Sequence, residues 1–198
     1  GDGILAETAI GVADRVFLGL SFGGQRLTGA SGPIWNPRPE ANVRVRILEE
    51  TARRPSLAVG FRTQGFGGYD EALGRYETKS LGLYAVFSRN YRNPLGEGGV
   101  HFGVNRSLED SDGDGDLTGY VGVNLDVGRR VSLATEYHFG WNDDGDGAQG
   151  TGRGYLNAAL RWKVGGRLAI ETALKNVLET AGAENFGRQV RVIYTTAM

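Results

Sequence analysis

The chain has 198 residues, a net charge of -1 and no cysteine, and 40% of its residues are hydrophobic. The absence of cysteine excludes disulfides, thiol catalysis and cysteine-ligated metals. Balanced charges give no support for nucleic-acid binding, and no run of about 18 apolar residues exists that could form a transmembrane helix. The opening "GDGILAE" indicates a turn that enters a strand and has no signal-peptide pattern, so we expect a mature or trimmed product.

Apolar and polar residues alternate along almost the whole chain, which predicts strands rather than helices. The pattern is clearest in "VSLATEYHFGW", residues 131–141, where one face is apolar and aromatic and the other is small, polar and charged. Eleven segments of this kind follow in chain order: 4–12, 16–22, 43–47, 57–61, 78–90, 100–104, 117–127, 131–141, 156–162, 168–174 and 188–196. The weakest is 78–90, because Tyr84 and Val86 lie on its polar face.

The connections between these segments alternate between short and long. Short turns are expected at 13–15, 50–55, 91–98, 127–130 and 164–167, and long polar connections at 23–40, 64–78, 109–116, 142–154 and 179–188. This alternation of short and long connections predicts an all-β, up-and-down antiparallel transmembrane β-barrel of about 11–12 strands. Single-chain outer-membrane barrels usually have an even number of strands, so we expect one domain over 1–198 with a preceding N-terminal strand missing.

The width of such a barrel decides which face points outward. Eight strands already enclose about as much space as side chains can fill, so Val and Leu would leave a wider interior empty. We therefore expect the apolar face to meet lipid; a soluble β-barrel or sandwich is the alternative. Aromatic residues near the ends of the apolar rows support the membrane interpretation: Phe22, Phe87, Trp141, Trp162 and Tyr194.

The opposite face supplies charged side chains to the predicted lumen. They are Glu7, Arg44, Arg46, Arg62, Asp126, Glu136, His138, Arg161, Lys163, Glu171, Lys175 and Arg191. These charges form either a salt-bridge network that plugs a narrow lumen or the lining of a weakly anion-selective passage. The two histidines, His101 and His138, are expected to be hydrogen-bonded lumen residues rather than general bases, and nothing predicts an enzyme.

Two acidic loops are the sharpest local signal. "DSDGDG" places Asp110, Asp112 and Asp114 at alternating positions, and "NDDGDG" does the same with Asn142, Asp144 and Asp146. Alternating oxygen ligands before a glycine match the first half of a calcium loop, although the closing Glu is missing from both. The loops are predicted to hold Ca²⁺, or else to be turns that suit Asp, Asn and Gly. No other cofactor is expected.

Longer runs of the sequence resemble poorly characterised bacterial outer-membrane barrels, loosely those of the YjbH type, which are associated with exopolysaccharide export. The runs are "GLSFGGQRLTGASGPIWNPRPEANVRVRILEETARRPSLAVGF", "RYETKSLGLYAVFSRNY", "GVHFGVNRSLEDSDGDGDL" and "GRGYLNAALRW". The resemblance implies a bacterial outer-membrane location and an envelope role, and carries over no catalytic residue.

The expected function is an integral outer-membrane barrel with a narrow, charge-filled lumen and a structural or accessory role in the envelope. A narrow diffusion pore is the alternative. The expected partners are outer-membrane lipid or lipopolysaccharide, with other envelope proteins or surface polysaccharide, and no nucleic acid.

Overall fold

A computed structural model describes residues 3–28, 32–94, 96–145, 148, 153–179 and 186–196. The fold is all-β, and the described part of the chain contains no helix that could span a bilayer. Eleven strands follow one another in a single antiparallel sheet and correspond to the eleven predicted segments. They are β1 (Gly3–Val12), β2 (Val16–Gln25), β4 (Glu40–Leu48), β5 (Ser56–Arg62), β8 (Gly82–Asn93), β9 (Gly96–Arg106), β10 (Thr118–Val127), β11 (Val131–His138), β12 (Tyr155–Lys163), β13 (Leu168–Lys175) and β14 (Gly187–Tyr194).

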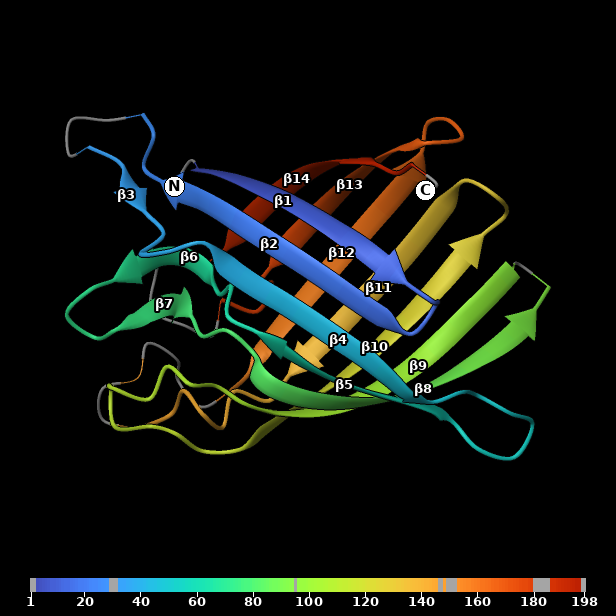
Figure 1. The fold of residues 1–198 in the computed structure, drawn as a ribbon, viewed down its shortest axis with the longest axis horizontal. Helices are drawn as coiled ribbons and strands as arrows, with labels where there is room; N and C mark the ends of the chain where they lie inside the picture. The colour runs from blue at the N-terminus through green and yellow to red at the C-terminus, as the bar shows by residue number, and fades with distance from the viewer. Residues whose placement is uncertain are drawn as a thin grey trace.

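Three further strands lie in connections that the sequence pattern left as loops. β3 (Ile34–Trp35) adds a short edge pairing to β2 and makes this sheet twelve-stranded. β6 (Phe66–Asp70) and β7 (Arg75–Thr78) form a separate hairpin within the connection predicted at 64–78. The long connections gather at one end of the curved sheet and the short turns at the other (Figure 1). These are called the long-connection end and the short-turn end below.

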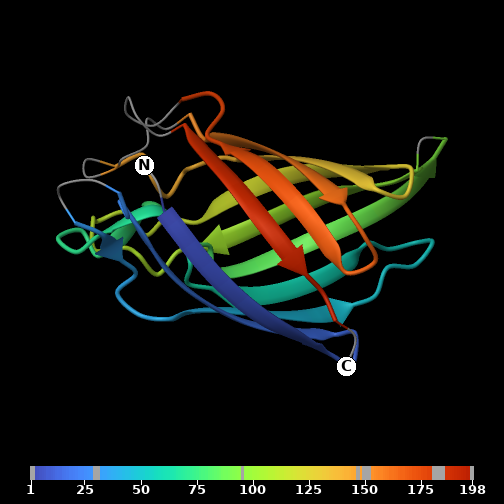
Figure 2. The same ribbon diagram turned by 90° about the horizontal axis from the view of Figure 1, so that it is seen from above.

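The sheet is not closed into a barrel, so the prediction of a closed barrel is wrong in this respect. In the described residues β1 pairs with β2 and β14 pairs with β13, but β1 and β14 do not pair with each other. Apart from β3, the strands of the meander number eleven, so its two end strands run in the same direction. Both end strands run from the long-connection end toward the short-turn end (Figure 2), and an antiparallel ladder cannot join two strands of the same direction.

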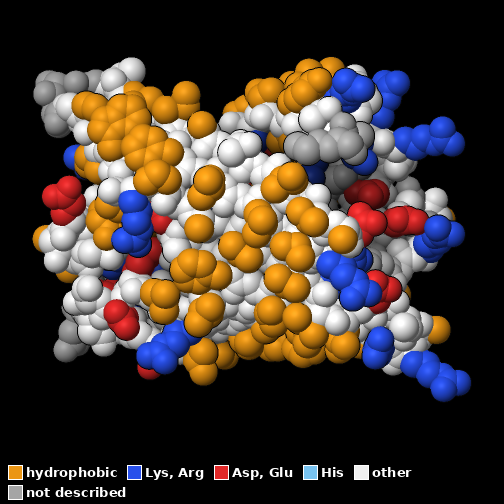
Figure 3. Space-filling model, in the orientation of Figure 1, with side chains coloured by type: hydrophobic (Ala, Val, Ile, Leu, Met, Phe, Trp, Pro, Cys, Tyr) orange, Lys and Arg blue, Asp and Glu red, His pale blue; other side chains and the backbone are white. Residues whose placement is uncertain are grey.

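Large hydrophobic side chains lie on the outer face of the sheet. β14 is the clearest case, because Val190, Val192 and Tyr194 are 70%, 73% and 66% exposed while the residues between them are half-buried. Figure 3 shows hydrophobic side chains across the middle of one face, with charged side chains toward the two ends. The buried hydrophobic residues of the described chain are few, namely Tyr76, Tyr120, Tyr155 and Ala173. The interior is therefore polar, and the apolar surface is outside.

Glycines on the inner face make room for interior tyrosines. Gly60 is paired with Tyr84, and Gly103 with Tyr120, across neighbouring strands. A Cβ at Gly60 would lie 2.4 Å from the Tyr84 ring, and one at Gly103 would lie 2.1 Å from the Tyr120 ring. Each aromatic ring thus lies over bare backbone. This explains why Tyr84, which weakened the strand prediction for 78–90, points inward.

Candidate functional site

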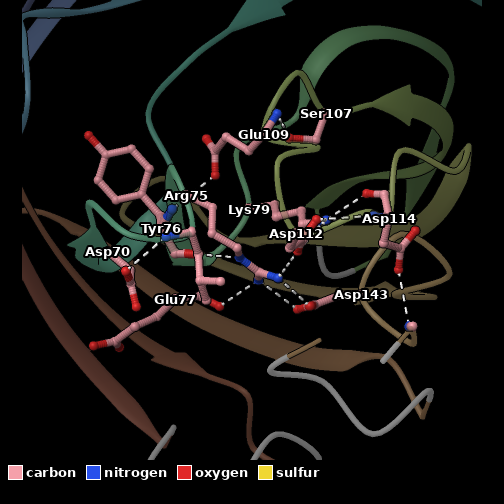
Figure 4. A network of polar contacts seen from close by, with 12 residues as sticks. Asp70, Arg75, Tyr76, Glu77, Lys79, Ser107, Glu109, Asp112, Asp114 and Asp143 are labelled. Atoms are coloured by element: carbon pink, nitrogen blue, oxygen red, sulfur yellow. Dashed lines mark hydrogen bonds and ion pairs between the residues drawn. The ribbon is translucent and has the colours of Figure 1, made fainter. Parts of the chain in front are cut away.

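The β6–β7 hairpin and two long connections form a polar cap at the long-connection end. We define the cap as residues 66–80, 107–116 and 139–145, which are joined by ion pairs and hydrogen bonds across distant parts of the sequence (Figure 4). Many of its polar side chains are buried, and Arg75 is the largest of these. Buried charges need partners, so the contacts of Arg75 decide how the cap is held together.

Arg75 is completely buried, and its contacts supply an acceptor for each of its five N–H donors. Nη1 donates to Asp112 and to Asp143, at 2.6 Å each, and Nη2 donates to the second oxygen of Asp143 at 3.0 Å. Nε donates to the carbonyl of Tyr76 and Nη2 also to that of Glu77. One guanidinium therefore fastens the hairpin to both acidic connections, in the bidentate geometry that favours Arg.

Lys79 is the second cation of the cap. Its ammonium donates to Asp112 at 2.8 Å and to the carbonyl of Asp114 at 2.7 Å. Asp112 thus lies between Arg75 and Lys79 with its side chain fully buried. Burial alone would raise the pKa of Asp112, but the hydrogen bonds from Lys79 and Arg75 outweigh it and lower the pKa. The carboxylate stays ionised in the cap.

The side chain of Glu109 binds backbone N–H groups in the hairpin and just after it. Its two carboxyl oxygens accept hydrogen bonds from the N–H groups of Tyr76 and Ser80. Burial is the largest influence on this group and raises the pKa of Glu109, although the hydrogen bonds and Arg75 partly oppose it. The Tyr76 hydroxyl in turn donates to the buried Glu40 of β4 at 3.0 Å, and burial raises the pKa of Tyr76.

The two acidic loops predicted to hold calcium are bound to other parts of the cap. Asp112 pairs with Arg75 and Lys79, and one oxygen of Asp114 accepts from the N–H groups of Asp144 and Gly145. Asn142 is buried, whereas Asp110 and Asp144 are exposed, and Asp146 lies outside the described residues. In the described chain no three acidic or histidine side chains are placed to hold one metal ion. The structure thus gives the calcium prediction no support.

The interior of the curved sheet contains a cavity of about 330 Å³ beneath the cap. Strands far apart in the sheet contribute to its wall, so their polar faces point toward a common interior. Of the twelve predicted lumen charges, five line this cavity: Arg62, Glu136, His138, Lys175 and Arg191. The base of the hairpin, at 65–67 and 78–79, lines the cavity on its cap side.

The other predicted lumen charges lie away from this cavity. Glu171 accepts hydrogen bonds from Arg161, at 2.6 and 2.8 Å, and pairs with Arg191 at 3.3 Å. Arg44 lies over the ring of Phe17, 5.3 Å from its centroid. The remaining four predicted lumen charges are less enclosed. Arg46, Lys163 and Glu7 are exposed, and Asp126 is half-buried.

The histidines are both hydrogen-bonded, as the sequence predicted. His101 contacts Ser88 at 2.8 Å and Asn124 at 2.7 Å, and His138 contacts Asn105 at 3.2 Å. Neither contacts a carboxylate, and no serine is held by a histidine–carboxylate pair in the described chain. The arrangement offers hydrogen bonding rather than a proton relay.

Sequence reasoning missed the central residues of the cap: Arg75, Lys79, Glu109 and Asp143. The missed pairs join positions up to 68 residues apart, and no local spacing encodes them. A signal existed in the charges, because Arg75 in the connection 64–78 and Lys79 just after it lie at the same end of an up-and-down sheet as two acidic connections. No family model matches the chain, and a search of curated proteins found no match.

Proposed function

We propose that the chain is an integral outer-membrane protein of a diderm bacterium, with a structural or accessory role in the envelope. The observation that carries this proposal is the inverted distribution of polarity: an exposed apolar outer face around a polar interior. A water-soluble fold buries its apolar face, and large exposed apolar patches mark contact with protein or membrane. A sheet that is apolar outside and polar inside suits a lipid environment.

Strand length and aromatic placement support the same environment. Most of the eleven strands have 8–12 residues, close to the roughly 9–11 that a tilted strand needs to cross a bilayer. Trp35 and Trp141 are exposed toward the long-connection end, and Tyr91, Trp162 and Tyr194 toward the short-turn end. Two such belts fit the two membrane interfaces, where amphipathic aromatic rings are enriched. Phe87, expected in a belt, lies in the middle of β8 instead.

The cap favours a structural role over an open passage. Its buried ion pairs connect the hairpin to both acidic connections, so the cap should remain closed over the cavity. The narrow pore is the second candidate, favoured by the cationic cavity wall of Arg62, Lys175 and Arg191. A role beside surface polysaccharide or another envelope protein is what the resemblance to exopolysaccharide-associated barrels implies.

Conductance in planar bilayers distinguishes the two candidates. The wild-type protein and a variant whose residues 66–78 are replaced by a short Gly-Ser linker would be reconstituted under the same conditions. We expect no steady openings from the wild type and steady openings from the variant. Steady wild-type openings would establish the pore, and failure of both proteins to float with lipid vesicles would contradict the membrane proposal itself.

A further inference from the structure

The cavity beneath the cap has more cationic than anionic groups in its wall. Among the described residues, four basic side chains line it, Arg62, Lys79, Lys175 and Arg191, against one carboxylate, that of Glu136. Lys79 is neutralised by Asp112, and Arg191 is paired with Glu171 at 3.3 Å. Two cations remain without an ion pair to any described residue, Arg62 and Lys175.

Arg62 also has an unused hydrogen-bond donor. Its Nε is inaccessible to solvent and has no acceptor among the described residues, and the Arg62 side chain forms part of the cavity wall. A buried guanidinium donor without an acceptor is costly, since its contacts with water have been removed without replacement. Arg191 repels both Arg62 and Lys175, although Glu7 and Glu136 attract Arg62 and Glu136 attracts Lys175. A negatively charged ligand in the cavity would offset the excess positive charge of its wall.

The cavity offers other polar groups beside these cations. Nδ1 of His138 and Oε1 of Gln189 are also buried without a partner in the described chain, and both residues line the cavity. Oε1 is an acceptor, and so is Nδ1 when Nε2 donates to Oδ1 of Asn105, so these two atoms suit a ligand that also carries a hydroxyl, as a protonated phosphate does. Phe66 of the hairpin lies beside Lys175, whose ammonium is 6.0 Å from the ring centroid. Convergent polar groups around a concave space of about 330 Å³ are typical of a site for a small ligand, for which volumes of roughly 300–1,000 Å³ are usual.

We propose that this cavity binds a small oxyanion, a free phosphate or carboxylate group, between Arg62 and Lys175. Arg suits such a ligand because its planar fork matches two oxygens of one carboxylate or phosphate, while Lys adds a point charge. The interior position selects a soluble anion over a lipid headgroup, since these side chains lie on the face opposite the exposed apolar rows. The site is independent of whether the sheet lies in a bilayer.

Calorimetric titration of the purified protein in a phosphate-free, non-ionic detergent tests the proposal. Inorganic phosphate and acetate are added separately, with chloride at matched ionic strength as the reference. We expect saturable binding of phosphate or acetate and none of chloride. Arg62→Gln and Lys175→Gln should each weaken binding by about tenfold or more, as expected for a lost charge-assisted hydrogen bond.

Two matched control variants, and one variant that should strengthen binding, make the test specific. Arg46→Gln and Lys163→Gln remove the same charges from exposed positions outside the cavity wall and should leave binding unchanged. Glu136→Gln removes the carboxylate of the wall and should strengthen binding. Absence of saturation up to about 10 mM phosphate, where a site with a Kd of about 1 mM is detectable, would overturn the proposal. An equal response to chloride, or equal weakening by the control variants, would overturn it too.

Thermal unfolding separates loss of binding from loss of folding. Phosphate should raise the Tm of the wild type and of Lys163→Gln but not that of Arg62→Gln. Without phosphate, Arg62→Gln should unfold at the wild-type temperature or above it, because the substitution removes an unsatisfied buried charge. A large fall in its Tm without ligand would show that Arg62 is already satisfied, and would contradict the proposal.

Discussion

The side chains on the outer face of the sheet and those in the cap are stabilised in opposite ways. On the outer face, side chains such as Val192 contact few other groups and depend on the surroundings for their stability. In the cap, Arg75 is fully buried and every donor has a partner within the protein. One region therefore depends on the solvent that covers it, and the other on internal pairing, so each should respond to different perturbations.

Arg75→Met should produce the largest effect. The substitution leaves Asp112 and Asp143 buried without their main partner, and breaking a buried pair from one side costs about 3–5 kcal/mol. Arg92→Met is the control, because Arg92 and Glu97 form a pair that is mostly exposed to solvent, and such pairs contribute little. Denaturant unfolding in detergent measures both. Similar losses for the two variants would mean that the cap is not held by Arg75.

Arginine placed on the two faces of one strand should act differently. Leu133 is 41% exposed on the outer face of β11, and its neighbour Ala134 lies on the inner face. Leu133→Arg should destabilise the membrane-inserted protein by about 2–4 kcal/mol if the site lies near the bilayer midplane. Ala134→Arg should cost less, because its side chain enters the polar interior. Equal refolding yields into lipid vesicles would contradict the assignment of the faces.

Glu109 should give the cap a pH dependence with a definite sign. Because the pKa of Glu109 is raised above its ordinary value of 4.5, the folded state binds this proton more tightly than the unfolded state. Stability from this group should therefore fall as the pH rises above 4.5 through the folded pKa. Asp112 acts in the opposite sense and only below its ordinary value of 3.8, because its pKa is lowered.

The substitution Glu109→Gln isolates this contribution. The variant should lose less stability than the wild type between pH 4.5 and neutrality, with Glu97→Gln, at an exposed position, as the control. Unfolding midpoints measured across that range provide the comparison. An unchanged pH profile in Glu109→Gln would show that the carboxyl titrates normally.

The smallest expected effect concerns the two end strands. β1 and β14 each have a neighbour on one side only in the described sheet, so their outward-facing amides lack a ladder partner. Hydrogen exchange should be faster in Gly3–Val12 and Gly187–Tyr194 than in β10, which is paired on both sides. Equal protection would indicate that another strand occupies the gap, one antiparallel to both ends.

The strands could be predicted from the sequence because alternation is a local property. The eleven predicted segments correspond to the eleven strands of the meander, although β8 and β9 run further into their turn and β11 ends at His138. The hairpin β6–β7 was missed because its strands are short and its residues are mostly polar or glycine. Closure was predicted wrongly, since pairing of the end strands depends on their relative direction and not on any local pattern.

The cap could not be predicted because its contacts are tertiary. The acidic spacing around Asp112 indicated a cation, and the structure supplies one from the chain itself in Arg75 and Lys79. Asp143 lies between two predicted calcium ligands, Asn142 and Asp144. It is Asp143, and neither of those two, that forms the bidentate pair with Arg75. Local spacing identifies carboxylates that need a positive charge, but it does not identify where that charge comes from.

Tryptophan fluorescence in brominated lipid tests the central claim most directly. The chain has three tryptophans, and Trp35, Trp141 and Trp162 are 50%, 53% and 47% exposed on the outer face or its rim. If this face meets lipid, bromine near the headgroups should quench the reconstituted protein strongly, and more than bromine at the bilayer centre. A folded, detergent-free monomer that is quenched by aqueous iodide and not by brominated lipid would contradict the account.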